Sequence, residues 1–201
     1  MFWDRVAGVY DLFVNVINGK THKALRRIVA DQIGPDDIVL ECACGTGLLS
    51  TVIAGECKQL IATDFAPKML KRAEKNCEEY RNVVFRQANI LSLDFPDGSF
   101  DKVVAGNVIH LLDEPLKALK ELDRVCRPGG KLIIPTYMNK DRKGKTSGFA
   151  SAVGKAGADF KRQFTVESYR QFFLEAGYGD VQITLAEGRI SCAVAVMMKK
   201  A

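Results

Sequence analysis

The stretch of residues 38–50 constrains the fold of this chain most, because an apolar run leads directly into a turn with two glycines. The run Ile38–Ala43 predicts a buried parallel strand, because all of its residues are apolar except one acid, Glu41. Gly45 and Gly47 remove Cβ atoms where the backbone must turn sharply and where a ligand can approach closely. A helical pattern from Leu48 directs its amide-rich N-terminus toward the same crevice. This strand–turn–helix predicts a site for a nucleotide-type cofactor.

Strand and helix patterns alternate from this stretch onward. The expected strands are Ile38–Ala43, Gln59–Thr63, Val83–Ala88, Phe100–Ala105, Lys131–Thr136 (after a tight turn at Arg127-Pro128-Gly129-Gly130), Asp180–Ala186 and Ile190–Met198. The expected helices begin at Leu48 and span Ala66–Tyr80, Pro115–Val125 and the residues from a Thr165 cap to Gly177. This alternation predicts an α/β fold with a Rossmann-like, doubly wound, mostly parallel seven-stranded sheet. Only Glu187-Gly188-Arg189 separates the last two strands, which predicts a C-terminal hairpin with one antiparallel strand.

Three further segments lie outside this alternation. Apolar residues at helical spacing predict helices over Phe2–Asn18 and Lys20–Ile33, with a break at Asn18-Gly19. Met138–Gln163 is basic, rich in Gly, Ala and Ser, and without a strong period, so we expect a substrate lid there. With no internal repeat or linker, residues 1–201 predict a single domain whose N-terminal helices occupy residues 1–34.

Length and composition favour a cytoplasmic protein with one substantial core. The chain has 201 residues, 47% of them hydrophobic, and no run of about 18 apolar residues that would predict a transmembrane segment. Its 29 Lys and Arg residues against 24 Asp and Glu residues are typical of an ordinary solvated surface. The six cysteines include no CxxC pair, which favours reduced, buried thiols over disulfides.

Four polar residues fall at or just after the ends of expected strands: Glu41, Asp64, Asn89 and Asn107. In a doubly wound sheet, ligands bind beyond these ends. Asp64 stands 19 residues after Gly45, where a carboxylate can accept hydrogen bonds from both hydroxyls of a ribose. The alternative for Asp64 is a helix cap, since Asp is also favoured before a first helical turn.

The glycine turn alone admits more than one class of cofactor. Gly45-x-Gly47-x-x-Ser50 nearly matches a dinucleotide fingerprint but lacks its third glycine. A nicotinamide-dependent oxidoreductase is therefore one hypothesis. The residues around the turn have to distinguish this class of cofactor from others.

Those residues resemble the class I S-adenosylmethionine-dependent methyltransferases. The resemblance rests on Glu41-x-Ala43-Cys44-Gly45-Thr46-Gly47, Asp64-Phe65-Ala66-Pro67-Lys68-Met69-Leu70, Leu93–Val104, Asn107–Leu112 and Arg124–Leu132, in the family's order. It runs from about Phe2 to Tyr137 and is nearest the small-molecule branch (methyltransferase type 11), which includes the ubiquinone and menaquinone C-methyltransferases.

The resemblance implies an enzyme that uses S-adenosylmethionine to methylate a small-molecule acceptor. Glu41 and the backbone of Ala43, Cys44, Gly45, Thr46 and Gly47 would hold the methionine end of the cofactor. Asp64 would hold the ribose, and Phe65 and Met69 would flank the adenine, although either could be plain core. Asn89 and Ile90 would meet the adenine edge, Asn107 would line the floor near the methyl group, and Tyr10 would close over the cofactor.

Three positions depart from the commonest residues of this family. Ala43 and Ala66 stand where glycine and serine are usual, and Asn89 replaces a frequent aspartate. The Asn89 amide oxygen can still accept a hydrogen bond from the adenine amine, but without a charge. We expect these changes to weaken cofactor binding slightly and to leave the class unchanged.

For the other candidate residues, a structural explanation without any functional role is also available. His110, just past the fourth strand, could act as a general base, but a histidine satisfied by backbone groups fits at least as well. Cys42 and Cys44 lack the second ligand pair that a zinc site needs, so no metal is expected. A basic run at Lys140, Arg142, Lys143 and Lys145 could meet an anionic substrate, with a solvated loop as the default.

The acceptor itself is not specified by the sequence. Asn107 is followed by Val108 and Ile109, not by the Pro-Pro-aromatic pattern of enzymes that methylate base amino groups, which argues against nucleic acid. The acceptor atom and the oligomeric state stay open. A non-catalytic S-adenosylmethionine-binding protein is a further alternative.

Overall fold

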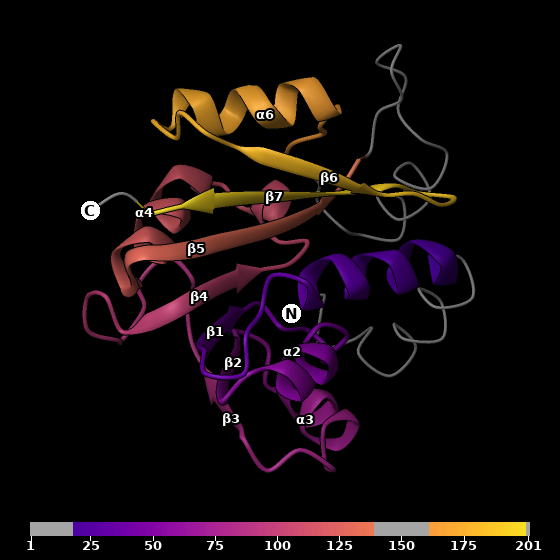
Figure 1. The fold of residues 1–201 in the computed structure, drawn as a ribbon, viewed down its shortest axis with the longest axis vertical. Helices are drawn as coiled ribbons and strands as arrows, with labels where there is room; N and C mark the ends of the chain where they lie inside the picture. The colour runs from indigo at the N-terminus through magenta and orange to yellow at the C-terminus, as the bar shows by residue number, and fades with distance from the viewer. Residues whose placement is uncertain (1–17, 139–160, 200–201) are drawn as a thin grey trace.

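A seven-stranded sheet organises the computed structural model, which describes residues 18–138 and 161–199. The strands are β1 (Ile38–Cys42), β2 (Gln59–Asp64), β3 (Val83–Gln87), β4 (Phe100–Ala105), β5 (Cys126–Tyr137), β6 (Gln182–Ala186) and β7 (Cys192–Met198). Their order across the sheet is β3-β2-β1-β4-β5-β7-β6 (Figure 1). β1 to β5 pair in parallel, and β7 runs antiparallel to both β5 and β6. The predicted doubly wound sheet with one antiparallel strand is confirmed.

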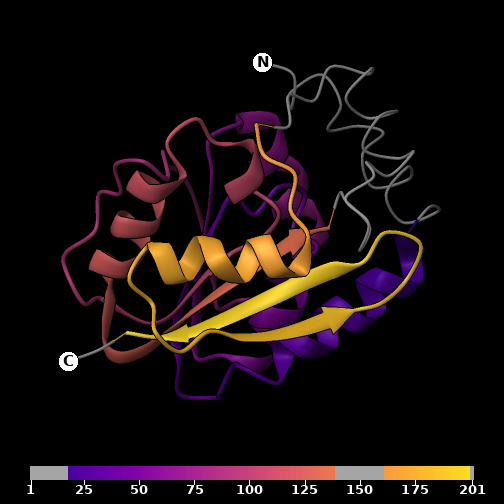
Figure 2. The same ribbon diagram turned by 90° about the horizontal axis from the view of Figure 1, so that it is seen from above.

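Helices cover both faces of the sheet (Figures 1 and 2). The helix of residues 18–30, α2 (Ser50–Glu56) and α3 (Pro67–Asn76) lie on one face, and α4 (Pro115–Val125) and α6 (Val166–Glu175) lie on the other. Side chains of a strand alternate between faces. In β4, Val103 accordingly packs in the core under α4 and α6, whereas Val104 packs in the opposite core. A short 3₁₀ turn, η1 (Ile109–Leu111), follows β4.

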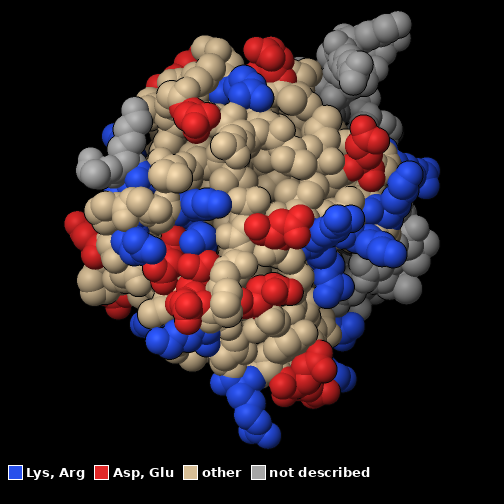
Figure 3. Space-filling view, in the orientation of Figure 1, with Lys and Arg blue, Asp and Glu red and all other residues tan. Residues whose placement is uncertain are grey.

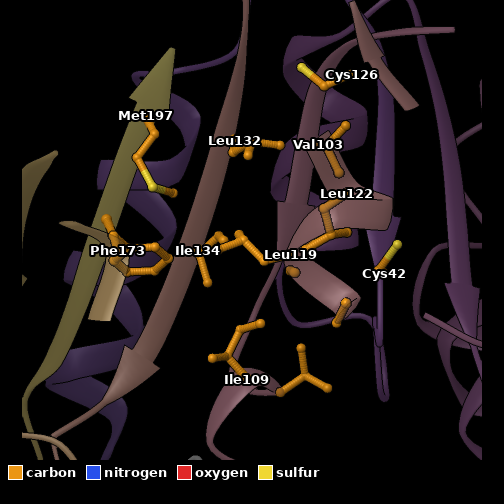
Figure 4. Packing of buried hydrophobic residues seen from close by; sticks show 14 of the residues in the cluster. Cys42, Val103, Ile109, Leu119, Leu122, Cys126, Leu132, Ile134, Phe173 and Met197 are labelled. Carbon is orange, nitrogen blue, oxygen red and sulfur yellow. The ribbon is translucent and has the colours of Figure 1, made fainter. Parts of the chain in front are cut away.

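The helix α4 shows why the periodicity of the sequence predicts its place. Its buried residues are Pro115, Ala118, Leu119, Leu122 and Val125, a helical stripe of spacing three and four. Figure 4 shows Leu119 and Leu122 directed toward Val103 of β4 and Ile134 of β5. Burying a leucine completely stabilises the fold by about 1.5–3 kcal/mol. The apolar stripe therefore fixes α4 against the centre of the sheet.

Two boundaries next to glycines differ from the predictions. The helix expected from Leu48 begins at Ser50, because the turn continues through residues 45–49. The turn expected at Arg127–Gly130 lies inside β5, where Phe100 pairs with Cys126 but Lys102 pairs with Lys131. The residues between these pairs form a bulge in which Gly129 (φ 73°) and Gly130 exchange backbone hydrogen bonds with Lys199. The other elements end within a few residues of their predicted limits.

The second expected helix reaches back to Asn18, because residues 18–30 form a continuous helix that includes Asn18 and Gly19. The Asn18 side chain makes long-range hydrogen bonds. Its Nδ2 donates to the carbonyl oxygen of Ile190 at 2.9 Å, and its Oδ1 accepts from the Ile190 amide at 3.1 Å. A second residue of the helix, Thr21, also donates to the Ile190 carbonyl, at 3.0 Å. Asn18 thus ties the helix to the connection between β6 and β7.

The remaining expectations concern the cysteines, membrane-spanning helices, the first helix and the lid. The six cysteines are buried and free. No helix within residues 18–138 and 161–199 has the length and apolar composition needed to cross a membrane. The helix expected over most of Phe2–Asn18 and residues 139–160 of the expected lid lie outside the described residues.

Candidate functional site

A cavity of about 450 Å³ opens at the carboxyl ends of β1, β2 and β4. This volume falls in the range of small-molecule sites, and the position is the switch point where the strand order reverses between β1 and β4. Of the residues that the sequence assigns to the cofactor, Glu41, Ala43, Cys44, Gly45, Thr46, Asp64, Phe65, Met69, Asn89, Ile90 and Asn107 line it. The structure therefore brings together residues from four separate stretches of the chain, 41–46, 64–69, 89–90 and 107. Tyr10 lies outside the described residues.

The two glycines of the turn have different tasks. Gly45 has φ 58° and Gly47 has φ 89°, both in the left-handed region that favours glycine. A Cβ on Gly45 would meet no atom within 4 Å, so the backbone there is open to a ligand. A Cβ on Gly47 would lie 3.3 Å from Cα of Ala73 in α3. Gly47 is not part of the cavity lining and instead lets α3 pack closely behind the turn.

Asp64 fixes the turn from the end of β2. Its Oδ2 accepts a hydrogen bond from the amide of Gly45 at 2.8 Å, and its Oδ1 accepts from the amide of Ala66 at 2.8 Å. The residue at the N-cap position of α3 is Ala66, so Asp64 does not cap that helix in the usual sense. A carboxylate can accept more than two hydrogen bonds. The arrangement is therefore compatible with ribose hydroxyls as additional donors.

Glu41 is a buried carboxyl group in the wall of the cavity. Its side chain is 2% exposed, and Ser50 Oγ donates to its Oε2 at 2.6 Å. Burial raises the pKa of Glu41 to about 8; the Ser50 hydrogen bond opposes this rise, and the negative charge of Asp64 adds to it. Glu41 is therefore mostly protonated at neutral pH, and a cationic group placed against it would favour its charged form.

Two non-glycine residues of the cavity have left-handed backbones. Ala43 and Asn107 both have φ 55°. The Asn107 amide donates to the carbonyl of Pro135 at 2.8 Å, and its Oδ1 accepts from the amide of Tyr137 at 3.1 Å. Such conformations cost on the order of 1–3 kcal/mol and occur mainly where surrounding contacts enforce them. The bonds of Asn107 to β5 are contacts of this kind.

The side of the cavity expected to hold adenine has an open rim and an apolar wall. Phe65 is 53% exposed, and Met69 is buried. The exposure of Phe65 excludes the plain-core alternative for this residue. Asn89 Oδ1 accepts from the Leu91 amide at 3.0 Å, which shapes the loop after β3.

Arg124 of α4 holds this loop in place. Its guanidinium donates to the carbonyls of Leu93 and Phe95, each at 2.8 Å, and to both carboxylate oxygens of Glu121 at 2.9 Å. The hydrogen bonds from Arg124 lower the pKa of Glu121, so the pair stays charged. The rim of the cavity is thereby fixed from the core of the domain.

His110 does not reach the cavity. Its neighbours Val108, Leu111 and Leu112 are part of the lining, but His110 is not, and its side chain is 2% exposed. Burial lowers the pKa of His110 to about 4. A neutral, enclosed imidazole gives no support to the general-base hypothesis, and we leave His110 out of the proposed function.

Sequence reasoning missed about half of the residues that line the cavity, most of them apolar. Leu48, Leu49, Ala88, Leu91 and Val108 all border the cavity, together with Thr63, Gly106, Leu111 and Leu112. Their signal is position, because each lies at or just after a strand end or in the glycine turn. Among the described residues, no group of three His, Cys, Asp or Glu side chains is placed to hold a metal ion.

The fold and the site define a class. The domain has a doubly wound sheet whose last strand in the sequence is antiparallel, a glycine turn after β1, an acid at the end of β2 and a cavity at the switch point. Together these features are typical of a domain that binds a nucleoside-containing cofactor. Comparison with known proteins narrows this class.

Residues 40–134 match the family model described as a methyltransferase domain. The chain is 32% identical over 173 residues to a phosphatidylethanolamine N-methyltransferase from Cereibacter sphaeroides, covering 84% of this chain and 81% of that protein. It is 34% identical over 137 residues to a demethylmenaquinone methyltransferase from Renibacterium salmoninarum, covering 67% of this chain and 56% of that relative's length. The chain therefore spans little more than half the length of that relative.

A solved structure shares the fold. Haemonchus contortus phosphoethanolamine N-methyltransferase 2, in complex with phosphomonomethylethanolamine and S-adenosylhomocysteine, matches with a TM-score of 0.75 at 15% identity, covering 98% of this chain and 58% of that one. With the sequence matches, this places the chain plainly: it belongs to the class I S-adenosylmethionine-dependent methyltransferases. The resemblance noted from the motifs is confirmed.

Proposed function

We propose that this protein transfers the methyl group of S-adenosylmethionine to a small-molecule acceptor. The observation that carries the proposal is the cavity at the switch point, where the open backbone of Gly45, the buried carboxyl of Glu41 and the carboxylate of Asp64 converge. Membership of the methyltransferase family supports the same reaction.

The residues fit this cofactor. The absent Cβ of Gly45 leaves room for close approach of the methionine end, and Glu41 would face its cationic amino group. Asp64 would accept hydrogen bonds from the ribose, while Met69 and the exposed ring of Phe65 would flank the adenine. When bound, S-adenosylmethionine supplies an electrophilic methyl group on a positively charged sulfur. The protein orients the two reactants and excludes water, which is the main means of acceleration open to it.

The acceptor would approach from the side of β4 and η1. Asn107, Val108, Leu111 and Leu112 form this side of the cavity, so the surface is apolar apart from one amide. Two relatives are named for acceptors with large apolar parts, a demethylmenaquinone and a phosphatidylethanolamine. We infer that the acceptor of this protein also presents an apolar body to this side.

Binding of S-adenosylhomocysteine tests the cofactor assignment. We expect this product to raise the melting temperature and to bind in calorimetry, while NADH and NADPH produce no shift. Stabilisation by NADH alone would instead identify an oxidoreductase.

Turnover is tested separately from binding. Labelled S-adenosylmethionine is offered with a naphthohydroquinone, with an ethanolamine phospholipid and with fractionated cell extract, and the labelled product is identified. Binding without transfer to any of these acceptors would contradict the proposed transfer and identify a non-catalytic binding protein.

A further inference from the structure

One side-chain amide in the wall of the cavity has a fixed orientation. Asn107 follows β4, and its Oδ1 accepts a hydrogen bond from the Tyr137 amide at 3.1 Å and a weak one from Sγ of Cys192 at 3.8 Å. A backbone N–H can only donate, so the atom of the Asn107 amide that faces it has to be the oxygen. The amide nitrogen, Nδ2, is therefore the atom that is turned away from β5.

This nitrogen is accessible from the cavity. Within residues 18–138 and 161–199, Nδ2 of Asn107 has no hydrogen-bond partner, and it is not among the side-chain atoms enclosed in the core. Asn107 itself lines the cavity. The two N–H groups of its amide are therefore available to a molecule that occupies this space.

The donor is also held in place before any ligand binds. The backbone amide of Asn107 donates to the Pro135 carbonyl at 2.8 Å, so the residue pairs with β5 through both its backbone and its side chain. Tyr137 is anchored in turn, because its hydroxyl oxygen lies 2.6 Å from Nε2 of His22 in the helix of residues 18–30. A donor that is fixed in this way needs little reorganisation when charge develops opposite it.

The position of Asn107 favours the methyl acceptor, not the cofactor, as its partner. The expected cofactor contacts run along β1, β2 and the loop after β3, whereas β4 lies on the other side of β1. Asn107 shares that side of the cavity with the apolar side chains of Val108, Leu111 and Leu112. Figure 3 shows Lys and Arg side chains on the outer surface, and none of those in the described part of the chain lines the cavity. The Asn107 amide is thus the side-chain donor that an acceptor meets there.

We propose that Asn107 is a catalytic residue whose side-chain amide donates a hydrogen bond to an oxygen atom in the reacting group of the methyl acceptor. The inference rests on the proposed function and gives one residue of the same site a role. An oxygen atom keeps a second lone pair when it accepts this bond, whereas a neutral amine would lose its single lone pair to the donor. In apolar surroundings the bond is stronger than in water, and it fixes the orientation of the acceptor.

Two substitutions separate a donor from a structural anchor. Asn107→Asp keeps an oxygen for the Tyr137 amide but replaces the N–H donor by a second carboxylate oxygen. Asn107→Gly removes both groups and suits the left-handed backbone at this position (φ 55°). If Asn107 only anchored β5, Asn107→Asp would be the more active variant. Since a carboxylate repels the acceptor oxygen, we expect Asn107→Gly to be the more active one.

The probe is the fraction of cell extract in which the wild-type protein forms a labelled product from labelled S-adenosylmethionine. At saturating S-adenosylmethionine, we expect Asn107→Gly to lower the rate of transfer about 10- to 100-fold and Asn107→Asp to lower it further. The affinity for S-adenosylhomocysteine, measured by calorimetry, should stay within about threefold. Gln59→Glu is the control and should keep the original rate, because it makes the same amide-to-acid change at the exposed first residue of β2.

The pH dependence gives a readout that an anchoring role would not produce. A protonated carboxyl group carries one O–H donor. The rate of Asn107→Asp relative to the wild type should therefore rise as the pH is lowered from about 8 toward the ordinary Asp pKa of about 3.9, while the relative rate of Asn107→Gly stays constant. Glu41 and Asp64 line the same cavity, and division by the wild-type rate removes their shared effect on the profile.

Three results would overturn the inference. A rate for Asn107→Asp that equals or exceeds that of Asn107→Gly at neutral pH, or a relative rate that does not change with pH, would reduce Asn107 to an anchor. A tenfold or larger loss of S-adenosylhomocysteine affinity in both variants would assign the donor to the cofactor and leave the proposed function intact. A wild-type chain that binds no S-adenosylhomocysteine, or labels no product in any fraction, would refute the proposed function itself, and this inference with it.

Discussion

At the scale of single residues, Asp64 serves the fold and the candidate site at once. It accepts from the amides of Gly45 and Ala66 in the described structure, so its carboxylate is already part of the turn before any ligand binds. Position and spacing predicted its place, but the motif could not show that the same oxygens hold the backbone of the turn.

The first prediction concerns the loss of this carboxylate. Asp64→Ala should weaken S-adenosylhomocysteine binding about 10- to 100-fold, because charge-assisted hydrogen bonds of roughly 1.5–3 kcal/mol are lost. It should also lower the free energy of unfolding by about 1–3 kcal/mol, since two backbone donors lose their acceptor. Calorimetry and urea unfolding measure the two effects. Glu114→Ala, which removes an exposed charge just before α4, should change neither by more than about 0.5 kcal/mol. Unchanged affinity in a folded Asp64→Ala protein would end the ribose assignment.

Ala43 stands where glycine is usual in the family. The free-energy cost of this alanine comes from its backbone conformation more than from steric crowding. Its φ of 55° costs an L-residue roughly 1–2 kcal/mol, while glycine loses about 0.5–1 kcal/mol more chain entropy on folding. Ala43→Gly should therefore raise the free energy of unfolding by about 0.5 kcal/mol. Ala54→Gly, the same substitution within α2, should instead lower it by about 1 kcal/mol. Urea unfolding of both variants checks the difference in sign, and destabilisation at both sites would show that Ala43 is unstrained.

The residues that motif reasoning found and missed differ in a physical way. Glu41, Gly45 and Asp64 belong to one turn and to the ends of two neighbouring strands, so short segments specify them. The contact of His22 with Tyr137 joins residues 115 positions apart and depends on how a helix crosses the sheet. No local pattern carries that information. Burial of His110 is likewise a property of the packed fold, which the sequence position alone does not reveal.

At the scale of elements, periodicity predicted helices and strands well, and long-range bonds caused the errors. The glycine pair at Gly129-Gly130 is typical of a turn, but its backbone groups pair with Lys199 near the end of the chain. Asn18 and Gly19 were likewise expected to precede the helix that starts at Lys20, but both are helical and the Asn18 side chain binds Ile190. In both cases the partner is distant in sequence, so local propensity was overridden by tertiary contacts.

The connection between β6 and β7 gives a prediction at this scale. A Cβ on Gly188 would collide with Oγ1 of Thr21 and lie 3.0 Å from the Thr21 backbone nitrogen. Gly188→Ala should therefore lower the free energy of unfolding by about 1–3 kcal/mol, because helix and hairpin must separate. Gly179→Ala is the matched control, since a Cβ there meets no atom within 4 Å. Equal unfolding curves for the two variants would show that the helix and the hairpin adjust without cost.

At the scale of the whole molecule, strand order follows from alternation and handedness, which is why the sheet was predictable. Right-handed crossovers leave few arrangements for alternating strands and helices. What alternation cannot predict is the electrostatic state of the assembled interior. The raised pKa of Glu41 arises only when β1, α2 and β2 close around one carboxyl group.

The stability of the empty protein should therefore depend on the ionisation of Glu41. Its pKa is about 8 when folded against 4.5 ordinarily, so the folded state holds the proton more tightly. The contribution of this proton is complete below pH 4.5 and is lost as the pH rises toward 8. Glu41→Gln cannot ionise, so its stability relative to the wild type should increase between these values, by on the order of a few kcal/mol.

Urea unfolding at several pH values measures this difference. Glu56→Gln, at the exposed end of α2, is the control and should follow the wild type throughout. A difference between Glu41→Gln and the wild type that stays constant with pH would mean that Glu41 is ionised in the folded protein.

The bonds of Asn18 and Thr21 to Ile190 have a consequence for building chimaeras within this family. Grafting the corresponding helix of a relative would bring in new residues opposite the carbonyl and amide of Ile190, and opposite Gly188, whose backbone lies against Thr21. The helix also carries His22, so a misfitted graft would displace that side chain from Tyr137. The transferable unit is therefore the helix together with residues 187–191, two pieces far apart in the sequence that have to be exchanged together.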